Sequence, residues 1–338
     1  MLLEGSPALA GRLPTGSVPG VREALVTSLG AGVHQVTLPL PWALDHVHCY
    51  ALEDRDGWTI VDCGLGTPGT ARRWTAVLEE LGSPRVGRIV VTHYHPDHVG
   101  AGRALRELTG APEVVQGRFD WELTQRAWIR PADGRFEAYL LHHGMPETEA
   151  AQSAGDESDT AVDPAEPTRL VDEGDALEIA GERFAVLVLP GHADGHIVLL
   201  GERTGRMLGG DVLLHDITPN VGRWEDTERD PLGRYLATLA RIAELAPASV
   251  FPGHKRLIDD PASRAREIAA HHAVRLDVHL EALRLGAETA YEVGVHVWGG
   301  GLGFHERRCA LVEAISHLER LEMEGRAAQD GPGRWRPA

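Results

Sequence analysis

Residues 92–100 of this chain, THYHPDHVG, carry the pattern that decides its fold. They place His93, His95 and His98 together with the carboxylate of Asp97, directly after the apolar run RIVVT. Such a β-branched run predicts a buried strand that ends where the histidines begin. Imidazole nitrogen and carboxylate oxygen are ligands that zinc and related cations take in proteins. His93 and His95 share a face of an extended backbone and can bind one ion. Asp97 and His98 lie around the turn and can reach a second.

Three more candidate ligands lie downstream. His192, Asp211 and His254 each follow a short apolar segment that ends in glycine: LVLPG, MLGG and VFPG. Polar residues at the ends of apolar strands lie where a sheet presents its functional site. With the cluster at 93–98 they give seven candidate ligands, which are enough for two ions.

Composition favours a globular chain without disulfides. The chain has 338 residues, of which 43% are hydrophobic, enough for a large α/β domain and a smaller one. Cys49, Cys63 and Cys309 are too scattered for a disulfide framework, so we expect a cytoplasmic location. We expect no signal peptide, and no run of about 18 apolar residues predicts a membrane span.

The formal net charge is −17. An acidic surface repels phosphate backbones and anionic membranes. We therefore expect a small-molecule substrate, and the charge disfavours nucleic acid or a membrane as a partner. A homodimer is possible.

The pattern along the chain predicts three parts. Residues 1–20 are expected to form a flexible lead-in, residues 21–260 the catalytic domain, and residues 261–338 a helical, winged-helix-like module. Inside the catalytic domain, residues 112–150 are predicted to be a mostly helical insertion. The acidic stretch 151–167 is predicted to be a mobile loop.

The histidine cluster and its downstream partners resemble the metallo-β-lactamase superfamily. Its pattern is His-x-His-x-Asp-His followed by separate His, Asp and His residues, and the likeness covers about residues 33–260. The resemblance implies an αββα sandwich and two metal ions, zinc being expected and iron or manganese possible. One ion would be held by His93, His95 and His192, the other by Asp97, His98 and His254. Asp211 would bridge them, and Asp62 would support the ligands from behind.

Two features bear on the reaction. β-Lactamases of this fold generally carry cysteine where this chain has Asp211, whereas the glyoxalase II, lactonase and ribonuclease-like branches carry aspartate. Residues 264–328 resemble the winged-helix extension of the β-lactamase-like protein 2 group. We therefore expect a dinuclear zinc hydrolase that attacks an ester, thioester or lactone carbonyl with a metal-bridging hydroxide. Asp97 is the candidate catalytic residue, expected to orient the nucleophile or pass on its proton.

Three alternatives remain at this point. The first is a metal-dependent endoribonuclease or phosphodiesterase of the same fold, which would cleave single-stranded RNA in a salt-dependent way. The second is a mononuclear iron dioxygenase, which one iron per chain would support. The third is a winged-helix binding protein without activity, which would leave the seven ligands unexplained.

Substrate contacts are less readable from the sequence. The insertion could arch over the metals, with Trp121, Trp128 and Tyr139 lining an apolar pocket; packing of the insertion itself is the other interpretation. A substrate role is also considered for His46, His48, Tyr50 and Lys255. We interpret His196 as a structural residue near the site, and the remaining histidines as core or surface residues.

Overall fold

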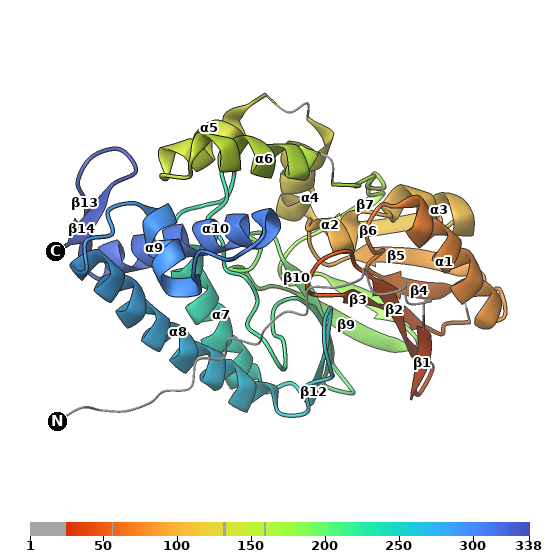
Figure 1. Cartoon of the computed structure of the whole chain (residues 1–338). Helices are drawn as coiled ribbons and strands as arrows, with labels where there is room; N and C mark the ends of the chain where they lie inside the picture. The colour runs from red at the N-terminus through yellow and green to blue at the C-terminus, as the bar shows by residue number, and fades with distance from the viewer. Residues whose placement is uncertain (1–24, 56, 131–132, 159) are drawn as a thin grey trace.

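The computed structural model describes residues 25–55, 57–130, 133–158 and 160–338. The predicted lead-in over residues 1–20 lies outside them. Within the described residues, two β-sheets face each other and helices cover both outer faces, as Figure 1 shows. None of the described helices has the length and apolar character needed to span a bilayer.

The first sheet has its strands in chain order. They are β1 (Leu25–Gly30), β2 (Val33–Pro39), β3 (His46–Leu52), β4 (Trp58–Val61), β5 (Val86–Val91), β6 (Glu113–Gly117) and β7 (Arg169–Val171). Strands β1 to β4 pair antiparallel, and β4 to β7 pair parallel. The parallel crossovers carry α1 (Pro68–Glu80) and the pair α2 (Pro96–Val99) and α3 (Gly102–Thr109). Strand β5 of this parallel half ends directly before the histidine motif.

The second sheet runs in the order β12-β11-β10-β9-β8. Its strands are β8 (Ala176–Ile179), β9 (Glu182–Val188), β10 (Ile197–Gly201), β11 (Arg206–Gly210) and β12 (Ser249–Pro252). Helix α7 (Pro231–Leu245) connects β11 to β12, which pair parallel. The downstream candidate ligands His192, Asp211 and His254 therefore follow the carboxyl ends of β9, β11 and β12.

Side-chain alternation along the strands explains the layers. In β10, Ile197 and Leu199 belong to the apolar cluster between the sheets, whereas Val198 belongs to the cluster that includes Tyr235 of α7. In β5, Val90 faces the other sheet and Ile89 packs with the α1 side. Because successive strand residues point to opposite faces, each sheet is buried on both sides. The observed αββα sandwich confirms the predicted fold class.

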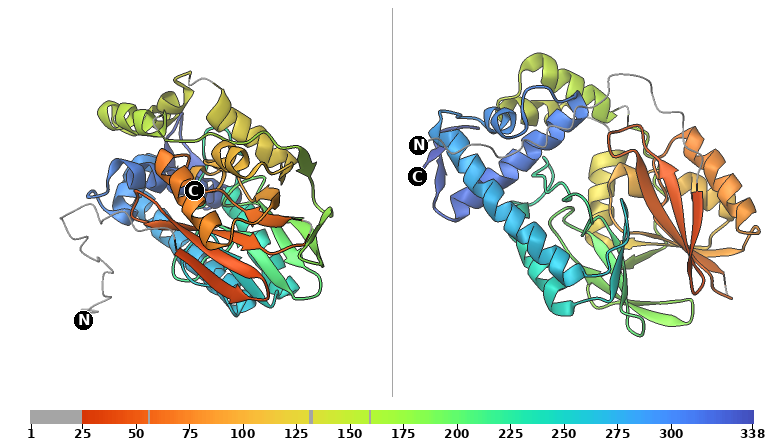
Figure 2. Two further views of the ribbon diagram at one scale, coloured as in Figure 1. Left: turned by 90° about the vertical axis from the view of Figure 1, so that its right-hand side faces the viewer. Right: turned by 60° about the horizontal axis from the view of Figure 1, so that its bottom comes forward.

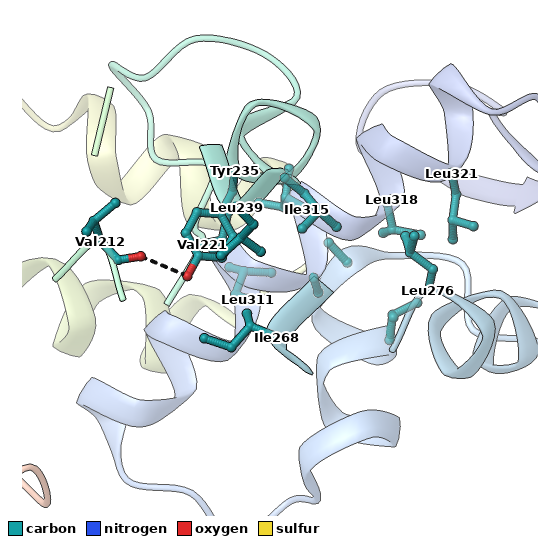
Figure 3. Packing of buried hydrophobic residues seen from close by; sticks show 14 of the residues in the cluster. Val212, Val221, Tyr235, Leu239, Ile268, Leu276, Leu311, Ile315, Leu318 and Leu321 are labelled. Atoms are coloured by element: carbon teal, nitrogen blue, oxygen red, sulfur yellow. Dashed lines mark hydrogen bonds between the residues drawn. The ribbon is translucent and has the colours of Figure 1, made fainter. Parts of the chain in front are cut away.

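The C-terminal module continues the same core. It consists of α8 (Pro261–Arg284), α9 (Ala290–Trp298), α10 (Phe304–Met323) and a hairpin of β13 (Ala327–Gln329) with β14 (Trp335–Pro337). The predicted helices and hairpin are thus present. Figure 3 shows Leu239 of α7 packed with Ile268 of α8 and with Leu311 and Ile315 of α10. The views in Figure 2 show α8 running alongside α7, so the module packs directly on the sandwich.

The insertion differs from its prediction. Its first residues form β6 inside the sheet, followed by α4 (Arg118–Thr124), a π-helix (Gln125–Ile129), α5 (Arg135–His142) and α6 (Glu147–Ser158). The prediction of a loop is wrong for residues 151–158, which lie in α6. Acidic Glu147 and Glu149 favour the start of this helix, and buried Ala150 and Ser153 pack it down. Figure 1 shows α5 and α6 above α9 and α10. Strands β1 and β7 were also not predicted from the sequence.

Candidate metal centre

Three histidine nitrogens converge on one point. The distance from His95 Nδ1 to His192 Nε2 is 2.8 Å, from His93 Nε2 to His95 Nδ1 3.1 Å, and from His93 Nε2 to His192 Nε2 3.3 Å. Nitrogens bound tetrahedrally to one zinc lie about 3.3 Å apart, given Zn–N bonds of about 2.0–2.1 Å. This trio therefore has the spacing of one ion's ligands. We call it the first ligand group.

A second ligand group lies beside the first and contains Asp97, His98 and His254. His254 Nε2 lies 3.3 Å from Asp97 Oδ2 and 3.1 Å from Asp211 Oδ2. Asp211 Oδ1 is 3.5 Å from His98 Nε2, and Asp211 Oδ2 is 3.7 Å from His192 Nε2. Asp211 thus reaches both groups, as a bridging carboxylate would.

Two observations show that these residues fit a cation. Among the described residues, His98 Nε2, His254 Nε2 and Asp211 Oδ1 are buried and make no well-formed hydrogen bond, although His254 and His98 lie 3.1 and 3.5 Å from Asp211 oxygens. Buried polar atoms without partners are costly unless something else binds them. In addition, a Cβ on Gly253 would lie 2.3 Å from Asp211 Oδ1 and 2.6 Å from His98 Cε1. Glycine here lets the β12 loop approach the ligands closely.

The opposite ring nitrogens of the ligands are held by hydrogen bonds. His98 Nδ1 pairs with Asp62 Oδ2 at 2.8 Å, His254 Nδ1 with the His46 carbonyl at 2.6 Å, and His192 Nδ1 with the Asn220 carbonyl at 2.7 Å. Each carbonyl can only accept, so it fixes a proton on Nδ1 and leaves Nε2 free for a cation.

Asp62 joins the ends of two strands behind the ligands. It follows β4 with a φ of +64°, a left-handed conformation that aspartate tolerates. Its carboxylate accepts from the Thr92 backbone N–H at 2.8 Å and from the Thr92 hydroxyl at 2.9 Å. Since it also pairs with His98 Nδ1, the Asp62 carboxylate lies directly behind this candidate ligand.

Charge coupling shapes the titration of the site. Burial disfavours the charged form of His254, but the carboxylates of Asp211 and Asp97 outweigh it and raise its pKa to about 9. Burial is likewise opposed at Asp97, where His98 and His254 lower the carboxyl pKa to about 2. Burial and neighbouring histidines lower the pKa of His93. Protons and metal cations therefore compete for the second ligand group, while the first stays neutral and ready to bind.

Two further residues support the ligand loops. Asp120 is buried, accepts from the Tyr94 backbone N–H at 3.0 Å and thereby fixes the turn between His93 and His95. His196 Nε2 accepts from the Asp211 backbone N–H at 3.1 Å. Its ring stacks on His93 at 4.6 Å. These contacts agree with the interpretation of His196 as a structural residue near the site, whereas no sequence motif marks Asp120.

Helix α10 reaches the centre through Asn220. Asn220 accepts from His192 through its carbonyl, while its side-chain N–H donates to Glu313 Oε2 at 2.9 Å and to the Cys309 carbonyl at 3.3 Å. Burial raises the pKa of Glu313 to about 7. A metal-ligand candidate of the sandwich is thus oriented from the C-terminal module. Asn220 and Glu313 could not be identified from the sequence, because they lie far apart in the chain and belong to no motif.

A cavity of about 1070 Å³ opens over the ligands. Trp128 lines it, and its ring N–H also donates to the Tyr94 carbonyl at 2.7 Å. Trp121 and Tyr139 are not among the lining residues, contrary to expectation. Tyr139 instead packs against the helical core and donates its hydroxyl to the Arg223 carbonyl at 2.5 Å. Its polar end thereby joins α5 to the loop between β11 and α7.

The early-strand residues considered for substrate contact also lie outside the lining. Tyr50 donates its hydroxyl to the Pro252 carbonyl at 2.7 Å, and His48 Nε2 lies 2.8 Å from the Lys255 carbonyl. They hold the loop that carries His254. Lys255 itself does not line the cavity; its ammonium group lies 3.9 Å from Asp45.

Comparison with known proteins agrees with this geometry. Residues 42–254 match the model of the metallo-beta-lactamase superfamily. A probable metallo-hydrolase of Bacillus subtilis (strain 168), YqjP, is 31% identical over 231 residues, which cover 65% of this chain and 70% of the relative. A hydroxyacylglutathione hydrolase of Vibrio cholerae is 28% identical over 171 residues, covering 51% of this chain and 48% of that protein.

Solved structures extend the likeness to the C-terminal helices. A metallo-beta-lactamase family protein from Thermus thermophilus superposes with a TM-score of 0.82 at 34% identity, covering 92% of this chain and 100% of that one. A beta-lactamase domain protein from Burkholderia ambifaria gives 0.83 at 25% identity, covering 96% and 97%. This chain therefore belongs to the metallo-beta-lactamase superfamily and is a metallo-hydrolase.

Proposed function

We propose that this metallo-hydrolase uses two zinc ions to hydrolyse carboxylic thioesters or esters. The observation that carries the proposal is the convergence of seven side chains on two adjacent points, with three buried ligand atoms that make no well-formed hydrogen bond among the described residues. Nitrogen and carboxylate donors in this ratio suit zinc.

In this proposal the residues have separate roles. His93, His95 and His192 hold the first cation, Asp97, His98 and His254 hold the second, and Asp211 lies between them. When bound, the two cations would activate a water molecule and stabilise negative charge on the substrate oxygen. We assign to Asp97 the orientation of that water and the transfer of its proton to the leaving group. Asp62 keeps His98 in the tautomer that leaves Nε2 free.

The cavity lining favours a carbonyl substrate over a phosphodiester. Four arginines line it: Arg126, Arg130, Arg135 and Arg308. Besides the carboxylates of the metal centre, six others line it: Asp133, Glu137, Glu225, Asp226, Glu306 and Glu313. A cavity with more acidic than basic groups repels a polyanion such as RNA. The relative named hydroxyacylglutathione hydrolase adds support, because hydroxyacylglutathione is a thioester.

The test is a substrate panel on the purified, zinc-loaded protein: thioesters, esters, lactones, β-lactams, phosphodiesters and single-stranded RNA. We expect turnover of thioesters or esters, loss of activity on chelation, and recovery with two zinc equivalents per chain. RNA cleavage that falls steeply with salt, without ester or thioester turnover, would favour the endoribonuclease alternative. One iron per chain would contradict the dinuclear zinc site.

A further inference from the structure

The cavity over the metal centre gathers aromatic side chains from distant segments. The chain has 8 tryptophans. Four of them line this one cavity: Trp42, Trp128, Trp224 and Trp298. They come from the loop after β2, the π-helix, the loop after β11 and the end of α9. Phe136 of α5 joins them. The cavity volume lies just above the range of about 300–1000 Å³ that is usual for ligand pockets.

These aromatic rings are held in fixed planes. Trp42 stacks on His305 of α10 with ring centres 4.9 Å apart and an interplanar angle of 5°. Phe136 stacks on Trp224 at 6.1 Å, and the Arg308 guanidinium lies over the Trp224 ring at 5.9 Å. The cavity walls therefore present flat apolar surfaces. Because these side chains are already held in place, they lose little further conformational entropy when a ligand binds.

Two of the four arginines that line the cavity, Arg135 and Arg308, are engaged by groups of this chain. Arg135 Nε donates to Asp133 at 2.6 Å, and its Nη1 lies 3.4 Å from Glu225. Arg308 donates to the Ser153 carbonyl at 3.1 Å and lies over Trp224. Cations engaged in this way are poor receptors for a highly charged substrate. The aromatic side chains, by contrast, present their apolar surface to the cavity.

We infer that the substrate is a thioester or ester with a large apolar acyl group, which occupies the aromatic cavity while its carbonyl lies at the metal centre. This inference rests on the proposed function. The apolar part is assigned to the acyl side because the soluble thiols that carry acyl groups in cells are polar. Hydrolysis adds water across the acyl carbon–sulfur bond of a thioester, or the acyl carbon–oxygen bond of an ester, and releases a fatty or aromatic carboxylic acid together with the thiol or alcohol.

The experiment uses the zinc-loaded full chain and thioesters of one small thiol, N-acetylcysteamine, with acetyl, butyryl, hexanoyl, octanoyl and decanoyl groups. Burial of each methylene contributes about 0.8 kcal/mol, so kcat/KM is expected to rise about fourfold per methylene until the cavity is filled. Trp224→Ala and Phe136→Ala should each lower kcat/KM for the decanoyl substrate at least tenfold and leave the acetyl substrate within twofold. Trp121→Ala, outside the lining, is the matched control and should keep the wild-type profile.

A binding measurement separates this inference from the proposed function. Decanoate should bind the wild type at least tenfold more tightly than butyrate by calorimetry, and Trp224→Ala should remove most of that difference. Thioester turnover with a flat acyl-length profile, or a profile that only the thiol changes, would overturn the inference and leave the hydrolase proposal standing. Absence of any thioester or ester turnover, with decanoate still preferred over butyrate, would instead refute the proposed function.

Discussion

This chain buries two groups of histidines that differ in chemistry. The metal-centre group includes His93, His95 and His192, whose nitrogens converge within 3.3 Å. The helical group consists of His272 and His279 of α8 and His317 of α10; we call it the helical histidine cluster. His279 and His317 stack face to face, with ring centres 4.2 Å apart and an interplanar angle of 5°.

The difference lies in what surrounds the rings. In the helical histidine cluster, His279 Nδ1 and His317 Nδ1 bond carbonyls four residues earlier in their own helices, at 2.7 and 2.8 Å. His272 Nε2 and His279 Nε2 are also buried without a partner among the described residues. Yet within that same part of the chain these three do not form a group suited to a metal. Unpartnered nitrogens are therefore not sufficient for a metal site, because at least three ligand atoms must also converge on one point.

The largest effect is expected from removing the carboxylate of Asp211, which reaches both ligand groups. Asp211→Ala should reduce bound zinc from two equivalents to one or none and lower kcat/KM at least about 1000-fold, because both ligand groups lose their shared carboxylate. Metal analysis by mass spectrometry and thioester turnover measure the two effects. His317→Leu, in the helical cluster, should retain two zinc equivalents. Equal zinc loss in both variants would contradict the distinction.

Gly253 tests how tightly the second ligand group is packed. Gly253→Ala puts a methyl group against Asp211 and His98, so zinc affinity should fall about 10- to 100-fold, as for other changes behind a metal ligand. Competition with a chelator of known affinity measures the change. Gly300→Ala is the control, since a Cβ there meets no described atom within 4 Å. Unchanged affinity in Gly253→Ala would mean that the ligands do not occupy the positions described.

The link from α10 to His192 should have a smaller effect. Glu313→Gln weakens the hydrogen bond that orients Asn220, and we expect about a tenfold loss of affinity for one of the two zinc ions. Titration with a chelator should separate this ion from the other. Glu322→Gln on the same helix, whose carboxylate pairs with Arg229, is the control. If both variants bind zinc like the wild type, α10 does not help to build the centre.

The helical histidine cluster should make the free energy of unfolding depend on pH. Burial lowers the pKa of His279 to about 3, below its value of 6.5 in the unfolded chain. Between these values the unfolded chain binds more protons, so stability is complete above pH 6.5 and falls as pH drops toward 3. The slope contributed by one histidine is at most about 1.4 kcal/mol per pH unit. Urea unfolding of His279→Leu between about pH 5 and 7 should show a shallower pH dependence than the wild type; an unchanged slope would contradict the low pKa.

Much of the sandwich could be predicted from the sequence because its strands are short and apolar and end in glycine or polar residues. The apolar segments before His93, Asp211 and His254 end within one residue of β5, β11 and β12, and the segment before His192 begins in the last residues of β9. The family pattern alone led us to expect Asp62 behind the ligands, and the structure places its carboxylate 2.8 Å from His98 Nδ1. Local sequence and motif spacing were sufficient for these elements.

What the sequence could not supply depends on contacts between distant segments. Helix α6 looked like a polar loop because its composition is acidic and small, yet packing against α10 makes it helical. The cavity walls combine Trp42, Trp224 and Trp298, which no local pattern connects. Asn220 and Glu313 become neighbours only after α10 packs on the sandwich. Tertiary packing decides each of these features.

We propose that the seven side chains of the first and second ligand groups and Asp211 form a centre for two metal ions. A crystal structure of the zinc-loaded protein, with anomalous scattering measured at the zinc edge, tests it most directly. We expect two peaks roughly 3.5–4 Å apart, one among the first ligand group and one among the second, with Asp211 between them. A single peak, or peaks away from these residues, would contradict it.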